Sequence, residues 1–255
     1  MPVYKLMDYS ILFPEPEEAR DDGLLAVGGD LKPARLINAY ANGIFPWYSP
    51  GQEILWWCPK PRFVIFPNEI NISGSMKKFI RKTTLYTKIN SNFAGVINNC
   101  RMLRINNTWL TDEMVVAYNV LHRMGYALSV EVYEQRSESE PNCEPKPSTE
   151  PKPSGEPETH GKSESGCNPE TLVGGLYGVV LGKCFFGESM FSLVPNASKL
   201  ALIELCSVLS SMGFVFVDCQ FHTEHLEKMG GRYISWEEYK KLLLRGRGTY
   251  DRYYF

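Results

Sequence analysis

The chain has 255 residues, 44% of them hydrophobic and 22% charged, a composition that supports one large or two modest folded domains. It contains no apolar run near the ~20 residues that a membrane span needs, and its first residues lack the pattern of a signal peptide. The seven cysteines form no C-x-x-C pair, which disfavours a disulfide framework and a ribbon-type zinc site. We therefore expect a protein of the reducing cytoplasm.

Helix and strand signals in the first half indicate a mixed chain. Residues 33–42 read as a helix stopped by Gly43, and 63–67 read as a short strand. A second helix is expected over 112–124, with Thr111 as its cap and apolar residues spaced for one buried face. The Trp- and Pro-rich stretch near 50–62 indicates the boundary region between two domains, which we expect to be a small domain, 1–66, and a larger domain, 67–255.

Two β-rich segments, 127–133 and 172–182, flank a tract of different composition and predict a hairpin with an insertion at its tip. The tract, 136–170, holds seven of the 17 prolines and no aromatic residue, which predicts disorder. Its eight Glu and four basic residues give it a charge of −4, so the remainder of this −2 chain carries +2. That balance permits an RNA partner, and the fold is expected to survive deletion of the tract.

The last third predicts a helix, a strand and a final helix. Asn196 is expected to cap a helix over 197–212, and FVFVDCQ, 214–220, reads as a strand. Ser235 and Glu238 form the pattern of a capping box for the final helix. The order of elements predicts a fold of the α/β (α+β) class with a small N-terminal portion.

Candidate catalytic residues occur at two places in the sequence. Glu188 follows an apolar strand and a flexible glycine, so it is either a group aimed at a ligand or an exposed residue at a strand end. Asp218 and Gln220 alternate with Cys219, which predicts that their side chains leave the same face of a strand. Asp218 is then either a proton acceptor oriented by the neighbouring amide or the cap of a turn.

Other groups give weaker signals. The six aromatic residues Phe45, Trp47, Tyr48, Trp56, Trp57 and Trp109 are too many for the core of a small domain, so some are expected to wall a pocket. The basic residues Lys77, Lys78, Arg81 and Lys82 form either a solvated face or a surface that follows a phosphate backbone. Cys219, His222 and His225 lack a fourth ligand, and no metal is predicted.

Eight motifs occur in order along the chain: GLLAVGGDL, RL-x-x-AY-x-x-GIFPWY, LWW-x-P-x-PR, TW-x-T, LVGGLYG, GESMFS, NASK-x-AL and DCQ. Together they closely resemble the bacterial leucyl/phenylalanyl-tRNA–protein transferases. The resemblance implies a C-terminal domain similar to the GNAT acyltransferase fold, interrupted by the insertion at 136–170. It also implies an enzyme that moves Leu or Phe from aminoacyl-tRNA to the N-terminal Arg or Lys of proteins, marking them for degradation.

The resemblance also implies roles for individual residues. Asp218, acting through Gln220, would assist removal of the amine proton, and Glu188 would bind near the reacting groups. The basic cluster at 77–82 would contact tRNA. The substrate walls would comprise Trp56 or Trp57, Trp109, Leu176, Phe185, Leu202 and Leu205. Because the aminoacyl ester is already activated, we expect no cofactor.

Two features depart from the family pattern. The tract at 136–170 is one. The other is Thr223, which stands where a relative can carry an Asn that contacts the acceptor peptide. A GNAT acyl-CoA-dependent N-acyltransferase is the alternative enzyme, disfavoured because the chain lacks the Q-x-x-G-x-G turn that cradles coenzyme A. An RNA- or peptide-binding module without activity is the third possibility.

Overall fold

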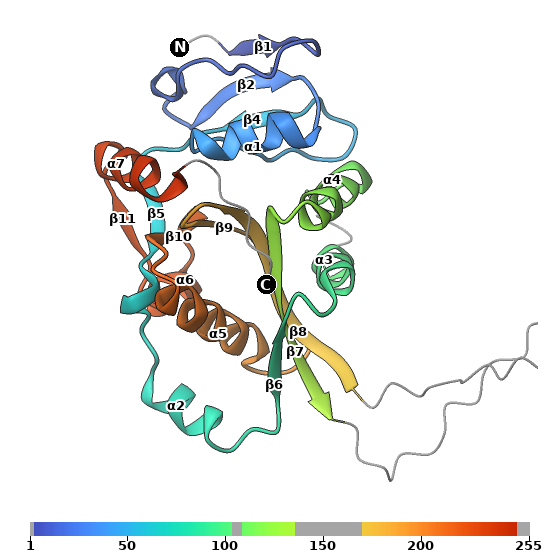
Figure 1. Cartoon of the computed structure of the whole chain (residues 1–255), viewed down its shortest axis with the longest axis vertical. Helices are drawn as coiled ribbons and strands as arrows, with labels where there is room; N and C mark the ends of the chain where they lie inside the picture. The colour runs from blue at the N-terminus through green and yellow to red at the C-terminus, as the bar shows by residue number, and fades with distance from the viewer. Residues whose placement is uncertain (1–2, 104–108, 136–169, 249–255) are drawn as a thin grey trace, which may run out of the picture.

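The computed structural model describes residues 3–103, 109–135 and 170–248, which form two β-sheets with helices around them (Figure 1). The first sheet has the strand order β1-β2-β4-β3. Its strands are β1 (Tyr4–Leu6), β2 (Leu24–Gly28), β3 (Phe45–Pro46) and β4 (Leu55–Trp57). The short helix η1 (Pro16–Glu18) precedes β2, and α1 (Pro33–Ala41) separates β2 from β3. In Figure 1, α1 lies between this sheet and the rest of the molecule.

The second sheet has seven strands in the order β11-β5-β10-β9-β8-β7-β6. They are β5 (Arg62–Ile65), β6 (Tyr86–Ile89), β7 (Ala127–Gln135), β8 (Glu170–Leu181), β9 (Cys184–Ser192), β10 (Phe216–Gln220) and β11 (Arg232–Ile234). Every neighbouring pair is antiparallel except β9 with β10, which are parallel. The predicted mixed α/β class is therefore confirmed.

Helices cover both faces of the large sheet. The remaining helices are η2 (Pro67–Glu69), α2 (Gly74–Ile80), α3 (Phe93–Met102), α4 (Asp112–Arg123), α5 (Ala197–Ser211), α6 (Glu224–Lys228) and α7 (Trp236–Arg247). One core joins α1, α3, α4 and α7 to one face, and α5 covers the other face. The alternation of β9 serves both cores, because Phe186 is buried in the first and Phe185 in the second.

Most predicted helix boundaries agree with the structure. Thr111 Oγ1 accepts from the Met114 amide at the start of α4, and Ser235 Oγ accepts from the Glu238 amide at the start of α7. Asn196 differs: it precedes α5 in the left-handed region, with φ 70°, and its side chain caps no amide. Its Oδ1 instead accepts from Lys199 Nζ at 3.4 Å.

The predicted hairpin is confirmed, since β7 and β8 pair antiparallel and Gln135 lies opposite Glu170 at its open end. Apart from Glu170, the tract between the two strands lies outside the described residues. The chain passes from the first sheet to the second between Trp57 and Arg62, a few residues before the predicted boundary at 66. None of the helices in the described ranges is long and apolar enough to cross a membrane.

Candidate active site

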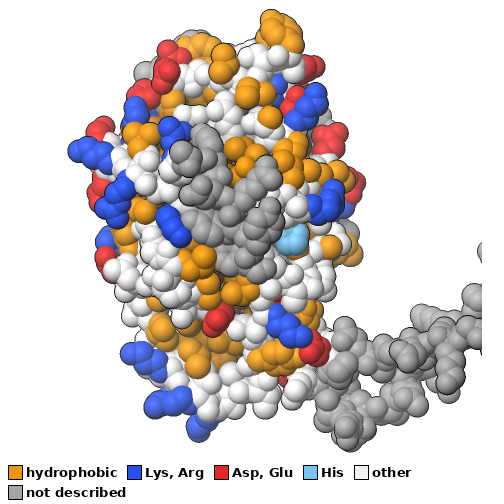
Figure 2. Space-filling model, in the orientation of Figure 1, with side chains coloured by type: hydrophobic (Ala, Val, Ile, Leu, Met, Phe, Trp, Pro, Cys, Tyr) orange, Lys and Arg blue, Asp and Glu red, His pale blue; other side chains and the backbone are white. Residues whose placement is uncertain are grey.

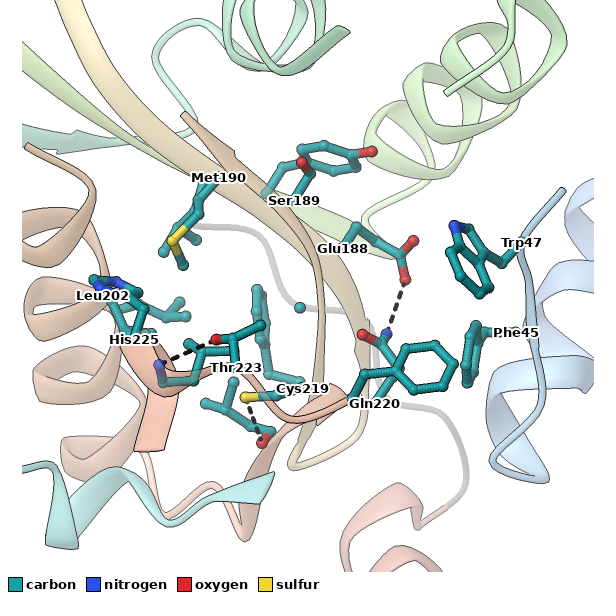
Figure 3. A pocket seen from close by; sticks show the side chains of 18 of the residues that line it. Phe45, Trp47, Glu188, Ser189, Met190, Leu202, Cys219, Gln220, Thr223 and His225 are labelled. Carbon is teal, nitrogen blue, oxygen red and sulfur yellow. Dashed lines mark hydrogen bonds between the residues drawn. The ribbon is translucent and has the colours of Figure 1, made fainter. Parts of the chain in front are cut away.

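A cavity of about 470 Å³ opens where the two parallel strands of the large sheet separate (Figure 3). Strand β10 pairs with β9 at only three positions, the last joining Asp218 to Phe186, although β9 continues to Ser192. Beyond that point Gly187, Glu188, Gln220 and Phe221 line the cavity, and the side chains of Glu188 and Gln220 point toward one another. The backbone groups freed by this separation, and the space between the strands, make a natural ligand site in the middle of the sheet.

Each of these strands carries a β-bulge at the cavity. In the β8–β9 ladder Gly178 pairs with Gly187 and Tyr177 with Ser189, so Glu188 is the extra residue. In the β10–β5 ladder Asp218 pairs with Val64 and Gln220 with Phe63, so Cys219 is the extra residue. Bulges re-aim side chains and are common next to active sites.

The bulge in β10 overturns one prediction. Simple alternation places Asp218 and Gln220 on the same face of the strand, but Gln220 adopts a left-handed backbone with φ 57°. Gln220 consequently lines the cavity together with Cys219, whereas Asp218 faces the core beneath α7 and does not line it. The sequence gives no signal for this reversal, because the extra residue depends on pairing with the distant strand β5.

Asp218 is almost fully buried, at 1% exposure, and both of its carboxylate oxygens are engaged. Oδ1 accepts from the Gln220 backbone amide at 2.9 Å, and Oδ2 accepts from the Tyr239 hydroxyl at 2.7 Å. Arg62, also buried, brings Nη1 to 3.8 Å from Oδ2 and compensates the charge. Asp218 therefore touches a cavity-lining residue through its hydrogen bond to the Gln220 amide.

Glu188 accepts from two tyrosine hydroxyls that come from distant parts of the chain. Tyr40 of α1 donates to Oε1 at 2.6 Å, Tyr118 of α4 donates to Oε2 at 2.7 Å, and the two hydroxyls lie 2.7 Å apart. Gln220 Nε2 lies 3.5 Å from Oε1 (Figure 3). Burial raises the pKa of Glu188 to about 7, and the charge of Asp218 adds to that effect against the tyrosine hydrogen bonds.

The walls of the cavity are largely the predicted ones. The following predicted substrate-binding residues line it: Trp109, Leu176, Phe185, Leu202, Leu205 and Thr223. Phe45 and Trp47, two of the aromatic residues from which pocket walls were expected, also line it, as do Met190 and Phe221, which were not predicted. Leu176 of β8, Phe185 of β9, and Leu202 and Leu205 of α5 form an apolar slot.

The other two predicted tryptophans do not line the cavity. Trp56 is fully buried, and its Nε1 donates to the Gly28 carbonyl at 2.9 Å. Trp57 packs against Trp47, and its Nε1 donates to the Trp47 carbonyl at 2.6 Å. Trp47 lines the cavity and has 41% of its surface exposed. The tryptophan that this region supplies to the cavity wall is therefore Trp47, and Trp57 packs against it.

The predicted tRNA-binding residues lie at the surface away from the cavity. Lys77 and Lys78 are exposed on α2, while Arg81 and Lys82 are exposed just beyond its last residue, Ile80. Figure 2 shows several basic side chains along the lower edge of the molecule, where Figure 1 places α2. Within the described ranges none of the four forms an ion pair with an acidic side chain.

The cysteine and histidines near β10 do not form a metal site. Cys219 lines the cavity, whereas the His222 ring contacts Phe63 and its Nε2 lies 3.0 Å from Glu227 Oε2. His225 lines the end of the cavity beside Leu202. No cluster of three or more His, Cys, Asp or Glu side chains suited to a metal occurs in the parts of the chain that the structure describes.

Comparisons with known proteins agree with this arrangement. The family model described as "Leucyl/phenylalanyl-tRNA protein transferase" matches residues 64–138 and 159–244, and the model of that family's N-terminal domain matches 29–60. The chain belongs to the leucyl/phenylalanyl-tRNA–protein transferase family. It is therefore an aminoacyltransferase. The family match resumes at 159 after leaving 139–158 unmatched, within the tract predicted to be an insertion.

Relatives of the same name cover nearly the whole chain. The leucyl/phenylalanyl-tRNA–protein transferase of Syntrophus aciditrophicus is 46% identical over 91% of this chain and 84% of its own length. That of Pseudomonas entomophila is 45% identical over 92% of this chain and 91% of its own. That of Desulforapulum autotrophicum is 42% identical over 99% and 95%. These comparisons do not favour the acyl-CoA-dependent alternative.

Proposed function

We propose that this protein transfers Leu or Phe from aminoacyl-tRNA to the N-terminal Arg or Lys of acceptor proteins, with the cavity between β9 and β10 as the active site. Such transfer marks the acceptor for degradation in the family that the chain resembles. One observation supports the proposal most directly: a single cavity contains both an apolar slot and a polar end. At the polar end, Gln220 Nε2 lies 3.5 Å from Glu188 Oε1.

The reaction needs orientation and proton handling. The acceptor's α-amine attacks the ester carbonyl carbon, a C–N bond forms, the C–O bond to the terminal ribose breaks, and the amine proton passes to the ribose oxygen. Because the ester is already activated, holding the two partners in contact supplies much of the rate. Gln220 is placed to accept a hydrogen bond from the attacking amine through Oε1 while its Nε2 points to Glu188.

Glu188 is suited to hold an amino group beside the ester. Its two oxygens already accept from Tyr40 and Tyr118, which fix the carboxylate in one orientation. With a pKa raised to about 7, a large fraction of Glu188 is ionised near neutral pH, and an ammonium group bound there gains a charge-assisted hydrogen bond. The same contact lowers the cost of bringing a charged amine into a partly buried cavity.

The apolar slot fits the side chain of the aminoacyl group. Leu205 and Leu202 of α5 line the cavity together with Phe185 of β9, and all three belong to the same hydrophobic core. A Leu or Phe side chain fills such a slot, whereas the loss of one methylene, as in Val, costs about 1–3 kcal/mol of selection. Trp47 and Trp109 supply aromatic faces on which the terminal adenine can stack.

Binding of the remaining tRNA and the acceptor is assigned to the rim and surface. Thr223 Oγ1 already accepts from the Leu226 amide, so Thr223 has its hydroxyl proton available for an acceptor peptide. Lys77, Lys78, Arg81 and Lys82, which form no ion pair within the described part of the chain, offer positive charge for the phosphate backbone.

One assay tests the proposal. The protein is mixed with labelled Leu-tRNA and peptides that begin with Arg, Lys or Ala. Label on the Arg and Lys peptides that RNase abolishes is the expected result. Transfer only from an acyl-CoA donor would replace the proposal with the acyl-CoA-dependent activity, and no transfer from either donor would leave a binding protein.

A further inference from the structure

Tyr239 of α7 is fully buried and lies on the side of β10 away from the cavity. Its hydroxyl donates to Asp218 Oδ2 at 2.7 Å. Burial, with the charge of Asp218 next in size, raises the pKa of Tyr239 well above its usual value, so the hydroxyl keeps its proton and remains a donor. Tyr239 does not line the cavity, and it can influence the reaction only through the residues it contacts.

Asp218 connects Tyr239 to Gln220 through its two carboxylate oxygens. Its second oxygen, Oδ1, accepts from the Gln220 amide at 2.9 Å and bridges the bulge in β10. Gln220 has φ 57°, a left-handed backbone conformation that is unfavourable for a residue with a side chain. A hydrogen bond from this amide to a fixed carboxylate offsets that cost and keeps the Gln220 side chain in the cavity.

Arg62 completes the support. Its guanidinium lies over the Tyr239 ring, 4.7 Å from the centroid, and its Nη2 donates to the Gly43 carbonyl. Gly43 has φ 71°, and a Cβ there would stand 2.8 Å from Tyr239 Cε1, so position 43, two residues after the end of α1, must be glycine for the ring to fit. Asp218 is thus held by a buried cation and a buried hydroxyl from two separate elements, β5 and α7.

We infer that Tyr239 is a positioning residue for aminoacyl transfer, because it fixes the Asp218 carboxylate that holds Gln220 in its left-handed conformation facing the cavity. This inference rests on the proposed function for its effect on turnover. It assigns a task in the reaction to the final helix, which contributes no residue to the cavity itself.

The test replaces the hydroxyl alone, in Tyr239→Phe. The variant loses a hydrogen bond to a charged group, and we expect this loss to lower kcat for transfer about 10- to 100-fold. KM for aminoacyl-tRNA is expected to stay unchanged, since Tyr239 does not line the cavity that holds the apolar slot, Trp47 and Trp109. Tyr48→Phe is the matched control: Tyr48 is buried and shares one hydroxyl hydrogen bond with Thr111, at 3.2 Å, away from Asp218.

A double variant separates positioning from general loss of stability. In a Gln220→Ala background, the same Tyr239→Phe change is expected to cause no further fall in kcat, because its effect passes through Gln220. An equal fall in both backgrounds, or a full kcat in the single variant, would overturn the inference. The inference would also be overturned if Tyr48→Phe lowered kcat as much as Tyr239→Phe does while changing the melting temperature by the same amount.

A second measurement does not depend on activity. Hydrogen exchange at the Gln220 amide is expected to be faster in Tyr239→Phe than in the wild type and in Tyr48→Phe. Unchanged exchange would overturn the inference. If the wild type fails to transfer Leu or Phe, the proposed function falls, and exchange at Gln220 still decides whether Tyr239 positions this part of the cavity.

Discussion

Gln220 Nε2 lies 3.5 Å from Glu188 Oε1, and the two residues meet across the gap where β10 and β9 diverge. Glu188 is the extra residue of one bulge, and Gln220 follows the extra residue of the other. The Gln220 amide donates a hydrogen bond to Asp218, and the Glu188 carboxylate accepts hydrogen bonds from two tyrosines. The pair joins the polar end of the cavity to two buried hydrogen-bond networks, which fixes both side chains before any substrate arrives.

Removing the Gln220 side chain is expected to lower turnover without weakening tRNA binding. In Gln220→Ala the amine loses its acceptor in the cavity, and kcat should fall about 100-fold, as is typical when a general acid–base group is removed. Asp218→Ala should lower kcat by a similar factor. Single-turnover transfer and filter binding of aminoacyl-tRNA measure the two quantities. Gln135→Ala, exposed at the end of β7, is the control, and full turnover in both site variants would remove their assignment.

The raised pKa of Glu188 predicts a pH dependence of stability. The folded protein holds this proton up to about pH 7, whereas the unfolded chain releases it near 4.5. Between these values the folded state binds more protons, so the free energy of unfolding falls as pH rises, by up to roughly 3 kcal/mol in total.

Glu188→Gln is expected to lack this dependence. Urea unfolding across pH 4.5–8 should show a steeper decline for the wild type than for this variant, with exposed Glu134→Gln behaving like the wild type. Parallel curves for wild type and Glu188→Gln would contradict the raised pKa and the buried environment that causes it.

Trp47 is expected to contribute to substrate binding, in contrast to Trp56. Trp47→Ala should raise KM for aminoacyl-tRNA by about 10- to 100-fold through lost base stacking, and Trp47→Phe should recover most of that loss. Trp56→Ala should mainly lower the melting temperature, because a fully buried Trp leaves a cavity worth about 3–5 kcal/mol. A KM unchanged in Trp47→Ala would move the adenine site elsewhere.

Sequence patterns predicted the outline of the site better than its geometry. Periodicity and caps placed α4, α7 and the β7–β8 hairpin, because these depend on residues close in the chain. Tyr40 and Tyr118 were missed as partners of Glu188, since they lie 148 and 70 residues away and nothing local marks them.

The two errors of detail have the same physical origin. Alternation cannot reveal a bulge, and the extra residue at Cys219 exists only because β10 pairs with β5. Likewise, Trp47, Trp56 and Trp57 lie close together in the sequence, and only pairing of β4 with β2 and β3 decides which ring is buried and which reaches the cavity. Composition shows that aromatic side chains are abundant there but does not orient them.

The basic residues at α2 are expected to set the salt dependence of tRNA binding. If Lys77 and Lys78 each neutralise a phosphate, replacing both with Gln should reduce the slope of log K against log salt by about 1.5–2. Lys5→Gln, exposed on β1, is the control. An unchanged slope in the double variant would show that these lysines are only a solvated surface.

The central claim is that the aminoacyl group sits between β9 and β10 with its carbonyl beside Gln220. A crystal structure with a non-hydrolysable phenylalanyl-adenosine tests it most directly. The account predicts the phenyl ring in the slot formed by Phe185, Leu202 and Leu205, with the amino group at Glu188. Clear density for the ligand in another part of the molecule, with this cavity unoccupied, would contradict it.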